Sequence, residues 1–296
     1  MSPINASPFQ HVVIAAHPQV REALAEGQEV AAFLQNHGVD AYAGLLYDEE
    51  LHRRVREGEA DLLIALGGDG TMLRAGHLCA PHGVPILGIN MGHFGFLIEV
   101  ERAEWRHTLR QLLLGEAWIE ERMMLEAQLV RGEEMVQRWD VVNEVVVSRG
   151  QFVRPVKVTA YVDDLLLARY VADGLIAATP TGSTAYALAA GGPILPPELR
   201  NILLMPVAPH LSVDRAVVLS EGSTVTLAVK VDHQAVVSVD GHDPVALEDG
   251  DRVHVRANRF PLKFVRFRGR GYFYRNLTSY MNWNPTVEKE SQRRQW

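Results

Sequence analysis

One short turn carries the residues whose chemistry is easiest to interpret. Gly67-Gly68-Asp69-Gly70-Thr71 follows the apolar run 61–66, and residues 71–78 read as the opening of a helix. A strand that passes through glycines into a helix gathers backbone N–H groups and the positive end of the helix dipole around one concavity, which suits a phosphate chain. A carboxylate there would repel phosphate unless it held a metal ion or accepted a proton from the group being phosphorylated. The turn therefore indicates a phosphoryl-transfer site, although a tight turn with Asp69 as helix cap explains the same residues.

A second polar feature interrupts the apolar run 141–147, which we expect to form a strand. Asn143 and Glu144 lie in its middle, and a buried amide or carboxylate costs several kcal/mol unless it is hydrogen-bonded. A ligand with sugar hydroxyls or an amide could supply the partners, and so could a neighbouring backbone edge. Because alternate residues of a strand face opposite ways, both side chains reach one ligand only at a bulge or a strand end.

The third feature is the hydroxyl-rich run Thr179-Pro180-Thr181-Gly182-Ser183-Thr184-Ala185-Tyr186, which follows a predicted short strand over 175–178. We expect a helix of small residues to start within it, with free N–H groups and hydroxyls at its first turn. Small side chains let a ligand or another backbone approach closely. The run therefore predicts a second polar cradle, and a capped helix packed tightly on the sheet is the structural alternative.

The elements that must position the glycine turn alternate between strands and helices. We expect strands over 11–16, 40–46, 61–66 and 84–89, and helices over 19–37, 49–58, 71–78 and 103–115. This alternation predicts a parallel sheet covered on both faces. Ligands of such sheets bind at the carboxyl ends of the strands, where residues 67–71 and a second glycine-bearing loop over 90–96 both fall.

The residue pattern of the sequence changes near Trp118. From there to about Val265, short runs rich in valine are separated by turn signals and predict a mostly β domain. The expected strands cover 125–130, 141–147, 156–162, 175–178, 225–231, 236–239 and 252–256. The chain thus divides into an α/β domain over 1–117 and a β-rich domain over 118–267. The tail 268–296 is first aromatic and then polar, so we expect its aromatic part to dock.

Composition limits the classes of function. The 296 residues carry a formal net charge of -7, which argues against a general nucleic-acid binder and favours small-molecule substrates. A single cysteine, Cys79, suits a reducing compartment, and we expect a cytoplasmic protein because no membrane-length apolar run or signal peptide is visible. The histidines show no metal-ligand spacing, so we expect no metal centre built from side chains. The glycine turn matches neither the Walker loop nor the dinucleotide fingerprint.

Taken together, the glycine turn, Asn143-Glu144, Asp173-Gly174 and the run 179–186 followed by Gly191-Gly192-Pro193-Ile194 resemble the motif set of NAD kinases over about residues 10 to 285. The turn alone is shared with diacylglycerol and sphingosine kinases. The resemblance implies an NAD kinase/diacylglycerol kinase-like fold: an N-terminal α/β domain with a parallel sheet, a β-rich, β-sandwich-like second domain, and a tail over 268–296 that returns to the first. The implied reaction is ATP-dependent phosphorylation of the 2′-hydroxyl of the adenosine ribose of NAD, with Mg²⁺ or another divalent ion neutralising the phosphates.

The resemblance also implies roles for single residues. Asp69 would be the general base that takes the proton of the ribose hydroxyl, while Gly68, Gly70, Thr71 and Arg74 would face the phosphates. Phe96 would contact adenine, Asn143 and Glu144 would bind NAD hydroxyls, and Asp173, Thr184, Ala185 and Tyr186 would add further NAD contacts. Some of these would cross a subunit interface, because the family forms homo-oligomers.

The sequence departs from the family pattern at two of the positions expected near the ligand. Ala189 replaces a common serine, and His242 stands where some relatives carry glutamine. Two alternatives remain at this point: a lipid kinase that uses the same turn, and a nucleotide-binding sensor without catalysis. A lipid kinase would need a large apolar cleft or a membrane face, and the sequence shows no basic amphipathic helix to provide one.

Overall fold

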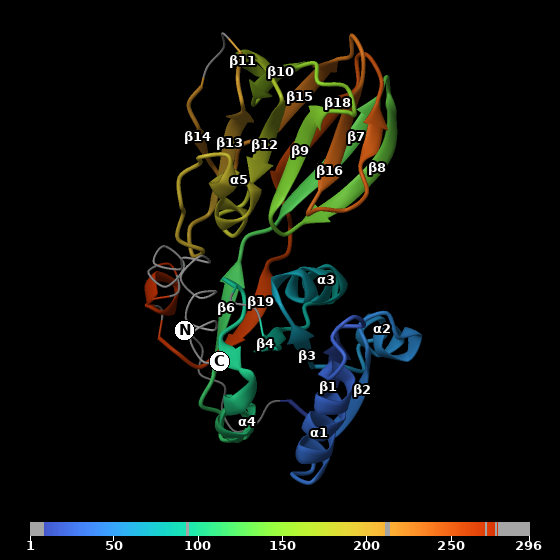
Figure 1. Ribbon diagram of the computed structural model, residues 1–296, viewed down its shortest axis with the longest axis vertical. Coiled ribbons are helices and arrows are strands. Elements are labelled where there is room, and N and C mark those ends of the chain that lie inside the picture. Colours follow the sequence, from blue (N-terminus) through green and yellow to red (C-terminus); the bar gives the residue numbers. More distant parts are fainter. Residues whose placement is uncertain (1–8, 93–94, 211–213, 270, 276, 278–296) are drawn as a thin grey trace, which may run out of the picture.

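The computed structural model describes residues 9–92, 95–210, 214–269, 271–275 and 277. Two bodies lie one above the other, an α/β domain that contains the N-terminal part of the chain and a β domain that follows it (Figure 1). The chain passes between them twice, near residue 123 and near residue 260. Helix α5 and the start of β9 lie at the end of the β domain that faces the α/β domain (Figure 1). The expected fold class is confirmed.

A seven-stranded sheet forms the centre of the α/β domain. Its order is β2-β1-β3-β4-β19-β6, with β5 paired to β4. All neighbours are parallel except β19 and β6. The strands are β1 (His11–Ala16), β2 (Asp40–Leu45), β3 (Leu62–Gly67), β4 (Ile86–Asn90), β5 (Val100–Glu101), β6 (Trp118–Arg122) and β19 (Leu262–Arg266). The observed bounds of β1 are those of the strand expected over 11–16.

Helices cover both faces of this sheet, because successive residues of the buried strands point to opposite sides. Val12 and Ile14 pack with α1 (Ala23–Gln35) and α4 (Trp105–Leu113). Val13 and Ala15 pack with α2 (Glu49–Arg56) and α3 (Asp69–Cys79). The short 3₁₀ turns η1 (Ala80–His82) and η2 (Arg102–Glu104) extend two of the connections. Cys79 lies fully buried in the second cluster as a small core residue.

Two strands of this sheet come from the region expected to belong to the second domain. β6 and β19 pair antiparallel, from Leu262 opposite Arg122 to Arg266 opposite Trp118, and β19 continues the sheet beside β4. The segment 118–267 therefore begins and ends with strands of the first sheet. We propose that the α/β domain includes 118–122 and 262–267, so that the β domain starts after β6 and ends before β19.

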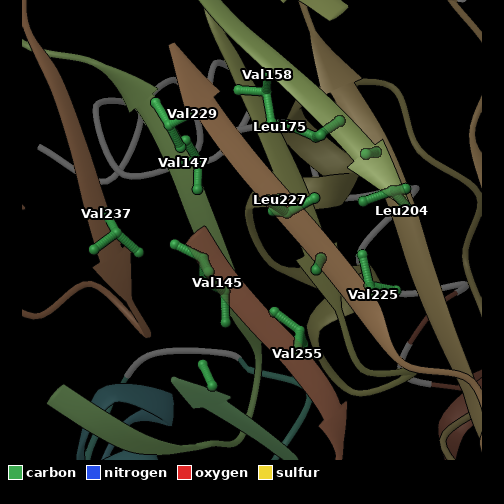
Figure 2. Close-up of a cluster of buried hydrophobic side chains, with 14 of the residues drawn as sticks. Val145, Val147, Val158, Leu175, Leu204, Val225, Leu227, Val229, Val237 and Val255 are labelled. Atoms are coloured by element: carbon green, nitrogen blue, oxygen red, sulfur yellow. The ribbon is translucent and has the colours of Figure 1, made fainter. Parts of the chain in front are cut away.

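The β domain is a sandwich of two six-stranded antiparallel sheets, with orders β11-β10-β15-β18-β7-β8 and β14-β13-β12-β9-β16-β17. Inward-facing aliphatic side chains from both sheets fill the space between them, among them Val145, Val147, Leu227 and Val255 (Figure 2). The strands are β7 (Leu125–Arg131), β8 (Glu134–Val141), β9 (Glu144–Arg149), β10 (Val156–Val162), β11 (Leu165–Ala172), β12 (Gly174–Ala178), β13 (Asn201–Val207), β14 (Val217–Ser220), β15 (Val225–Lys230), β16 (Ala235–Val239), β17 (Val245–Leu247) and β18 (Arg252–Ala257).

Two expected elements of the β domain differ from the observed ones. The strand predicted over 141–147 is interrupted: β8 ends at Val141, β9 starts at Glu144, and the two strands belong to different sheets. The helix predicted after the hydroxyl-rich run is short, consisting of the 3₁₀ turn η3 (Gly182–Thr184) and the single turn α5 (Tyr186–Ala189). No helix among the described residues is long and apolar enough to cross a membrane.

Candidate active site

The glycine turn lies at the carboxyl end of β3, as predicted. β3 ends at Gly67 and α3 begins at Asp69, with Gly68 as its N-cap residue. A Cβ on Gly67 would come within 2.0 Å of Thr71 Oγ1, so only glycine lets the strand pass this closely under the first helical turn. The Thr71 hydroxyl is buried and has no hydrogen-bond partner within the described chain.

The Asp69 carboxylate turns away from its own helix and towards the second glycine loop. Its Oδ2 accepts a hydrogen bond from the Phe96 amide at 2.8 Å, and its Oδ1 accepts one from the Leu97 amide at 3.1 Å. A Cβ on Gly95 would come within 2.2 Å of Oδ1, so the loop can approach only because residue 95 is glycine. A carboxylate accepts about four hydrogen bonds. Each oxygen of Asp69 therefore keeps accepting capacity after its orientation is set.

Burial and hydrogen bonding act on Asp69 in opposite directions. Burial raises its pKa, while the two amides and the positive charges of Arg122 and Arg266 lower it, and the net change is upward. A carboxylate whose pKa is raised towards the operating pH is a better proton acceptor than an ordinary aspartate. This is the electrostatic setting that a general base requires.

A network of buried charged side chains supports the loop that carries Phe96 and Leu97. Arg266 donates to the Leu97 carbonyl at 2.9 Å and to Glu120 at 2.8 Å. Tyr272, at the start of the tail, donates to Glu120 at 2.9 Å and accepts a hydrogen bond from Arg122. Burial alone would raise the pKa of Glu120, but the two arginines lower it to about 2. The aromatic start of the tail therefore docks on β6 and β19, whereas the expectations for 278–296 lie outside the described residues.

Asn143 and Glu144 lie at the interruption between β8 and β9, where the chain crosses from one sheet of the sandwich to the other. The buried Asp240 carboxylate holds this crossing by accepting hydrogen bonds from the amides of Val142, Asn143 and Glu144 at 2.7 to 2.9 Å. Asn143 Oδ1 and Glu144 Oε2 are buried without a hydrogen-bond partner in the described part of the chain. Asn143 and Glu144 thus lie at a strand end, where both side chains were expected to be able to reach one ligand.

Glu144 is the most strongly perturbed carboxyl group of this region. Burial and the neighbouring negative charge of Asp240 raise its pKa from 4.5 to about 8, although the Tyr186 amide donates to it and acts the other way. A buried carboxyl group beside a second carboxylate retains its proton because both cannot ionise cheaply. At neutral pH Glu144 is therefore mostly protonated, and its hydroxyl is a hydrogen-bond donor.

The hydroxyls of the predicted cradle divide into two groups. Thr179 Oγ1 donates to the Val142 carbonyl at 2.7 Å, and Ser183 Oγ donates to the Pro180 carbonyl at 2.6 Å and accepts from the Leu195 amide at 2.9 Å. Both side chains are fully buried, so they hold the turn together instead of facing a ligand. Thr181 and Thr184 are the members that border open space.

A small pocket of about 130 Å³ lies where the two domains meet. The α/β domain contributes Asp69 and the loop that orients its carboxylate. The β domain contributes the crossing between β8 and β9 and the hydroxyl-rich run that follows β12. The lining residues are Asp69, Phe96, Leu97, Asn143, Thr181, Thr184 and Ala185. Five of the residues singled out in the sequence thus surround one space, although they span more than a hundred positions of the chain.

Other expected site residues lie outside this pocket. Arg74 is on the exposed side of α3, where it donates to the Tyr47 hydroxyl at 2.6 Å. Asp173 precedes β12 and pairs with Arg149, whereas the cradle follows the other end of that strand, about 16 Å away at the usual rise per residue. Ala189 is exposed at the end of α5, and the His242 ring packs against the His77 ring, with centroids 5.2 Å apart and the planes tilted by 42°.

Three residues that shape the site were missed in the sequence. Asp240 belongs to the turn signal Asp240-Gly241 of the sequence, although a lone aspartate directly after an apolar strand is also a signal for backbone capping. Thr181 was part of the hydroxyl-rich run without being singled out. Arg266 ends the strand Leu262–Arg266, and because Lys263 is a second charge in that strand, the sequence does not mark Arg266 as the buried one. The second glycine-bearing loop over 90–96 also contains His93, which lies outside the described residues.

The comparisons with known proteins agree with this arrangement. Residues 12–117 match the model of the ATP-NAD kinase N-terminal domain, and residues 142–267 match the model of the ATP-NAD kinase C-terminal domain. The NAD kinase of Chloroflexus aurantiacus is 38% identical over 273 residues, which cover 92% of this chain and 98% of the relative. The NAD kinase of Heliobacterium modesticaldum is 44% identical over 225 residues, or 76% of this chain and 79% of the relative.

Solved structures show the same relationship. Yeast NADH kinase complexed with NADH superposes with a TM-score of 0.79 at 25% identity, covering 96% of this chain and 93% of the other. An NAD kinase from Archaeoglobus fulgidus in complex with ATP superposes with a TM-score of 0.71 at 25% identity, covering 91% and 96%. Neither the lipid-kinase nor the sensor alternative is favoured by these matches. The chain belongs to the ATP-NAD kinase family.

Proposed function

We propose that Asp69 is the general base of the ATP-dependent phosphorylation of NAD that this chain catalyses. Its carboxylate takes the proton of the 2′-hydroxyl of the adenosine ribose. The hydroxyl oxygen then forms a bond to the γ-phosphorus of ATP, the bond to the β,γ-bridging oxygen breaks, and ADP leaves. Holding the hydroxyl and the γ-phosphate together in one small space supplies much of the rate enhancement.

In this proposal the α/β domain binds ATP and the β domain binds most of NAD. Gly68, Gly70 and the Thr71 hydroxyl, which has no partner in the described chain, line the ATP phosphates at the start of α3, and Arg74 can reach them by leaving Tyr47. Asn143 and Glu144 offer buried polar atoms without partners in the described chain, which suit the hydroxyls of NAD. Thr184, Ala185 and the Tyr186 side chain complete the acceptor side, and Phe96 offers an aromatic face to adenine.

The observation that carries the proposal is the shared pocket. Asp69 is the only carboxylate among the described residues that line it, together with Asn143 and Thr184 from the other domain. The reaction needs a base beside a ribose hydroxyl, and the described lining of this pocket offers Asp69 as a base with polar neighbours. The raised pKa of Asp69 supports the same role.

A divalent cation, Mg²⁺ or a similar ion, belongs to this proposal as the partner of ATP. Among the described residues no group of three or more His, Cys, Asp or Glu side chains could hold a metal ion. We therefore assign the cation to the triphosphate oxygens, with Asp69 the nearest carboxylate of the pocket. There it would neutralise charge on the phosphates.

We also propose a homo-oligomer, in which Asp173 and His242 can meet the NAD bound by a partner subunit. Asp173 is half-buried at the end of β12 remote from the pocket of its own subunit, a position that suits a contact with NAD bound by another copy. The single buried thiol of Cys79 fits a reducing compartment, and we place the enzyme in the cytoplasm.

The test is the Asp69→Asn variant in an NADP-formation assay with NAD, ATP and Mg²⁺. Asparagine keeps the shape and accepts one backbone amide but cannot take a proton, so turnover should fall by at least about a hundredfold, the usual contribution of a general base. Asp164→Asn, on an exposed turn, is the matched control. NAD binding measured without ATP should persist in both variants. An Asp69→Asn enzyme that keeps most of its turnover would rule out the assigned base.

A further inference from the structure

The Asp240 side chain, which the mechanism above does not use, lies where the two domains join. It is fully buried, and its two oxygens accept the amides of residues 142–144. Its own amide donates to the Glu144 carbonyl at 3.0 Å. Asp240 adopts a positive φ of 49°, a conformation that a non-glycine residue keeps only when its surroundings demand it. The turn after β16 is therefore shaped to hold the loop that carries Asn143 and Glu144.

A histidine from the other domain contacts the same carboxylate. His77 Nε2 lies 2.9 Å from Asp240 Oδ2. His77 is in the last turns of α3, the helix that begins with Asp69, about 12 Å further along the helix axis. One rigid helix therefore carries the base at its first residue and a contact to the acceptor loop near its last.

Apolar side chains pack closely around the contact between His77 and Asp240. Val142, the first residue of the loop, belongs to the hydrophobic core of the α/β domain with Met72 and Leu262. A Cβ on Gly76, beside His77, would lie 3.0 Å from Leu262 and 3.5 Å from Val142. The loop is thus held by apolar contacts on the side of α3 and by the Asp240 carboxylate on the side of the β domain. His77 is the polar group that connects the two.

We propose that His77 is a positioning residue, which sets the distance between the acceptor loop and the base by holding Asp240. The inference rests on the proposed function, since it assumes that Asn143 and Glu144 bind the substrate whose hydroxyl meets Asp69. The three backbone amides already satisfy Asp240 within the β domain. The contact with His77 therefore adds nothing that the β domain needs for itself, but it fixes that domain against α3.

The proposal predicts that removing the His77 side chain lowers turnover without lowering the affinity for NAD. Without His77 the β domain still binds NAD through its own residues, so affinity for NAD remains. The 2′-hydroxyl, however, is no longer held at the correct distance from Asp69. A misplacement of about 1 Å is enough to cost on the order of a hundredfold in rate.

The experiment compares His77→Leu and His77→Gln with the wild-type enzyme. Leucine removes the polar contact, so kcat should fall between about ten- and a hundredfold, while the Kd for NAD measured by calorimetry without ATP changes by less than about threefold. Glutamine places an N–H group at a similar reach and should restore kcat to within about threefold of wild type. His82→Leu, an exposed histidine just beyond the same helix, should behave as wild type.

A second measurement uses the Asp240→Asn background. If His77 acts through Asp240, adding His77→Leu there should lower kcat by less than about threefold, because the two substitutions remove one interaction. The proposal is overturned if His77→Leu keeps wild-type kcat, if kcat and NAD affinity fall together, or if glutamine fails to rescue. Wild-type enzyme that forms no NADP would instead refute the proposed function.

Discussion

Replacing Glu144 with glutamine should stabilise the free enzyme, and the gain should grow with pH. Glu144 is buried beside the Asp240 carboxylate, and burial together with that charge raises its pKa to about 8. The folded protein therefore binds a proton at Glu144 that the unfolded chain releases near pH 4.5. Between these two values the free energy of unfolding falls as pH rises, because the unfolded state holds fewer protons.

The magnitude follows from this pKa difference. Each pH unit inside the window costs about 1.4 kcal/mol, so Glu144 lowers stability by roughly 1 kcal/mol at pH 5 and by about 4 kcal/mol at pH 8. Glutamine resembles the protonated acid in shape, accepts the Tyr186 amide in the same way, and never ionises. The difference in unfolding free energy between Glu144→Gln and wild type should accordingly widen by about 3 kcal/mol over this range.

Reversible urea unfolding followed by far-UV circular dichroism at pH 5, 6, 7 and 8, without ligand, measures this difference. Glu133→Gln, in the exposed turn between β7 and β8, is the control, and its stability relative to wild type should stay within about 0.5 kcal/mol at every pH. A gap between Glu144→Gln and wild type that does not widen with pH would show that Glu144 is ionised in the folded enzyme. The assigned hydrogen-bond donor would then be wrong.

Two further substitutions test the support of Asp69. Gly95→Ala should lower NADP formation at least about tenfold without changing the circular dichroism spectrum, because its Cβ would approach Asp69 Oδ1 to 2.2 Å and displace the carboxylate. Tyr272→Phe should reduce the free energy of unfolding by about 1 to 3 kcal/mol in urea titrations, because a buried hydroxyl that is hydrogen-bonded to Glu120 is lost.

Each of these two predictions has an outcome that contradicts it. Gly222→Ala is the matched glycine control, since no heavy atom lies within 4 Å of its Cβ position, and it should leave NADP formation unchanged. If Gly95→Ala is as active as Gly222→Ala, the loop is not needed to orient the base. If Tyr272→Phe is as stable as wild type, the start of the tail does not contribute to the α/β domain through its hydroxyl.

Features that depend on neighbouring residues were predicted well. The strands over 11–16 and 156–162 have the expected bounds, and the glycine turn connects a strand to a helix as expected. Apolar periodicity and glycine conformations are local properties, which the sequence displays directly. The resemblance in motif order indicated the family, and both domain models agree with it.

The tertiary structure decided what depends on residues far apart in the chain. The pairing of β19 with β6 joins segments about 150 positions apart, and no local pattern marks these two strands as part of the first sheet. The interruption at Asn143 and the burial of Glu144 arise only when Asp240, about a hundred residues later, caps the loop. Sequence alone supplied the chemical groups of the site. Their protonation, partners and spacing across the domain junction came from the fold, because burial and long-range electrostatics exist only once the chain has packed.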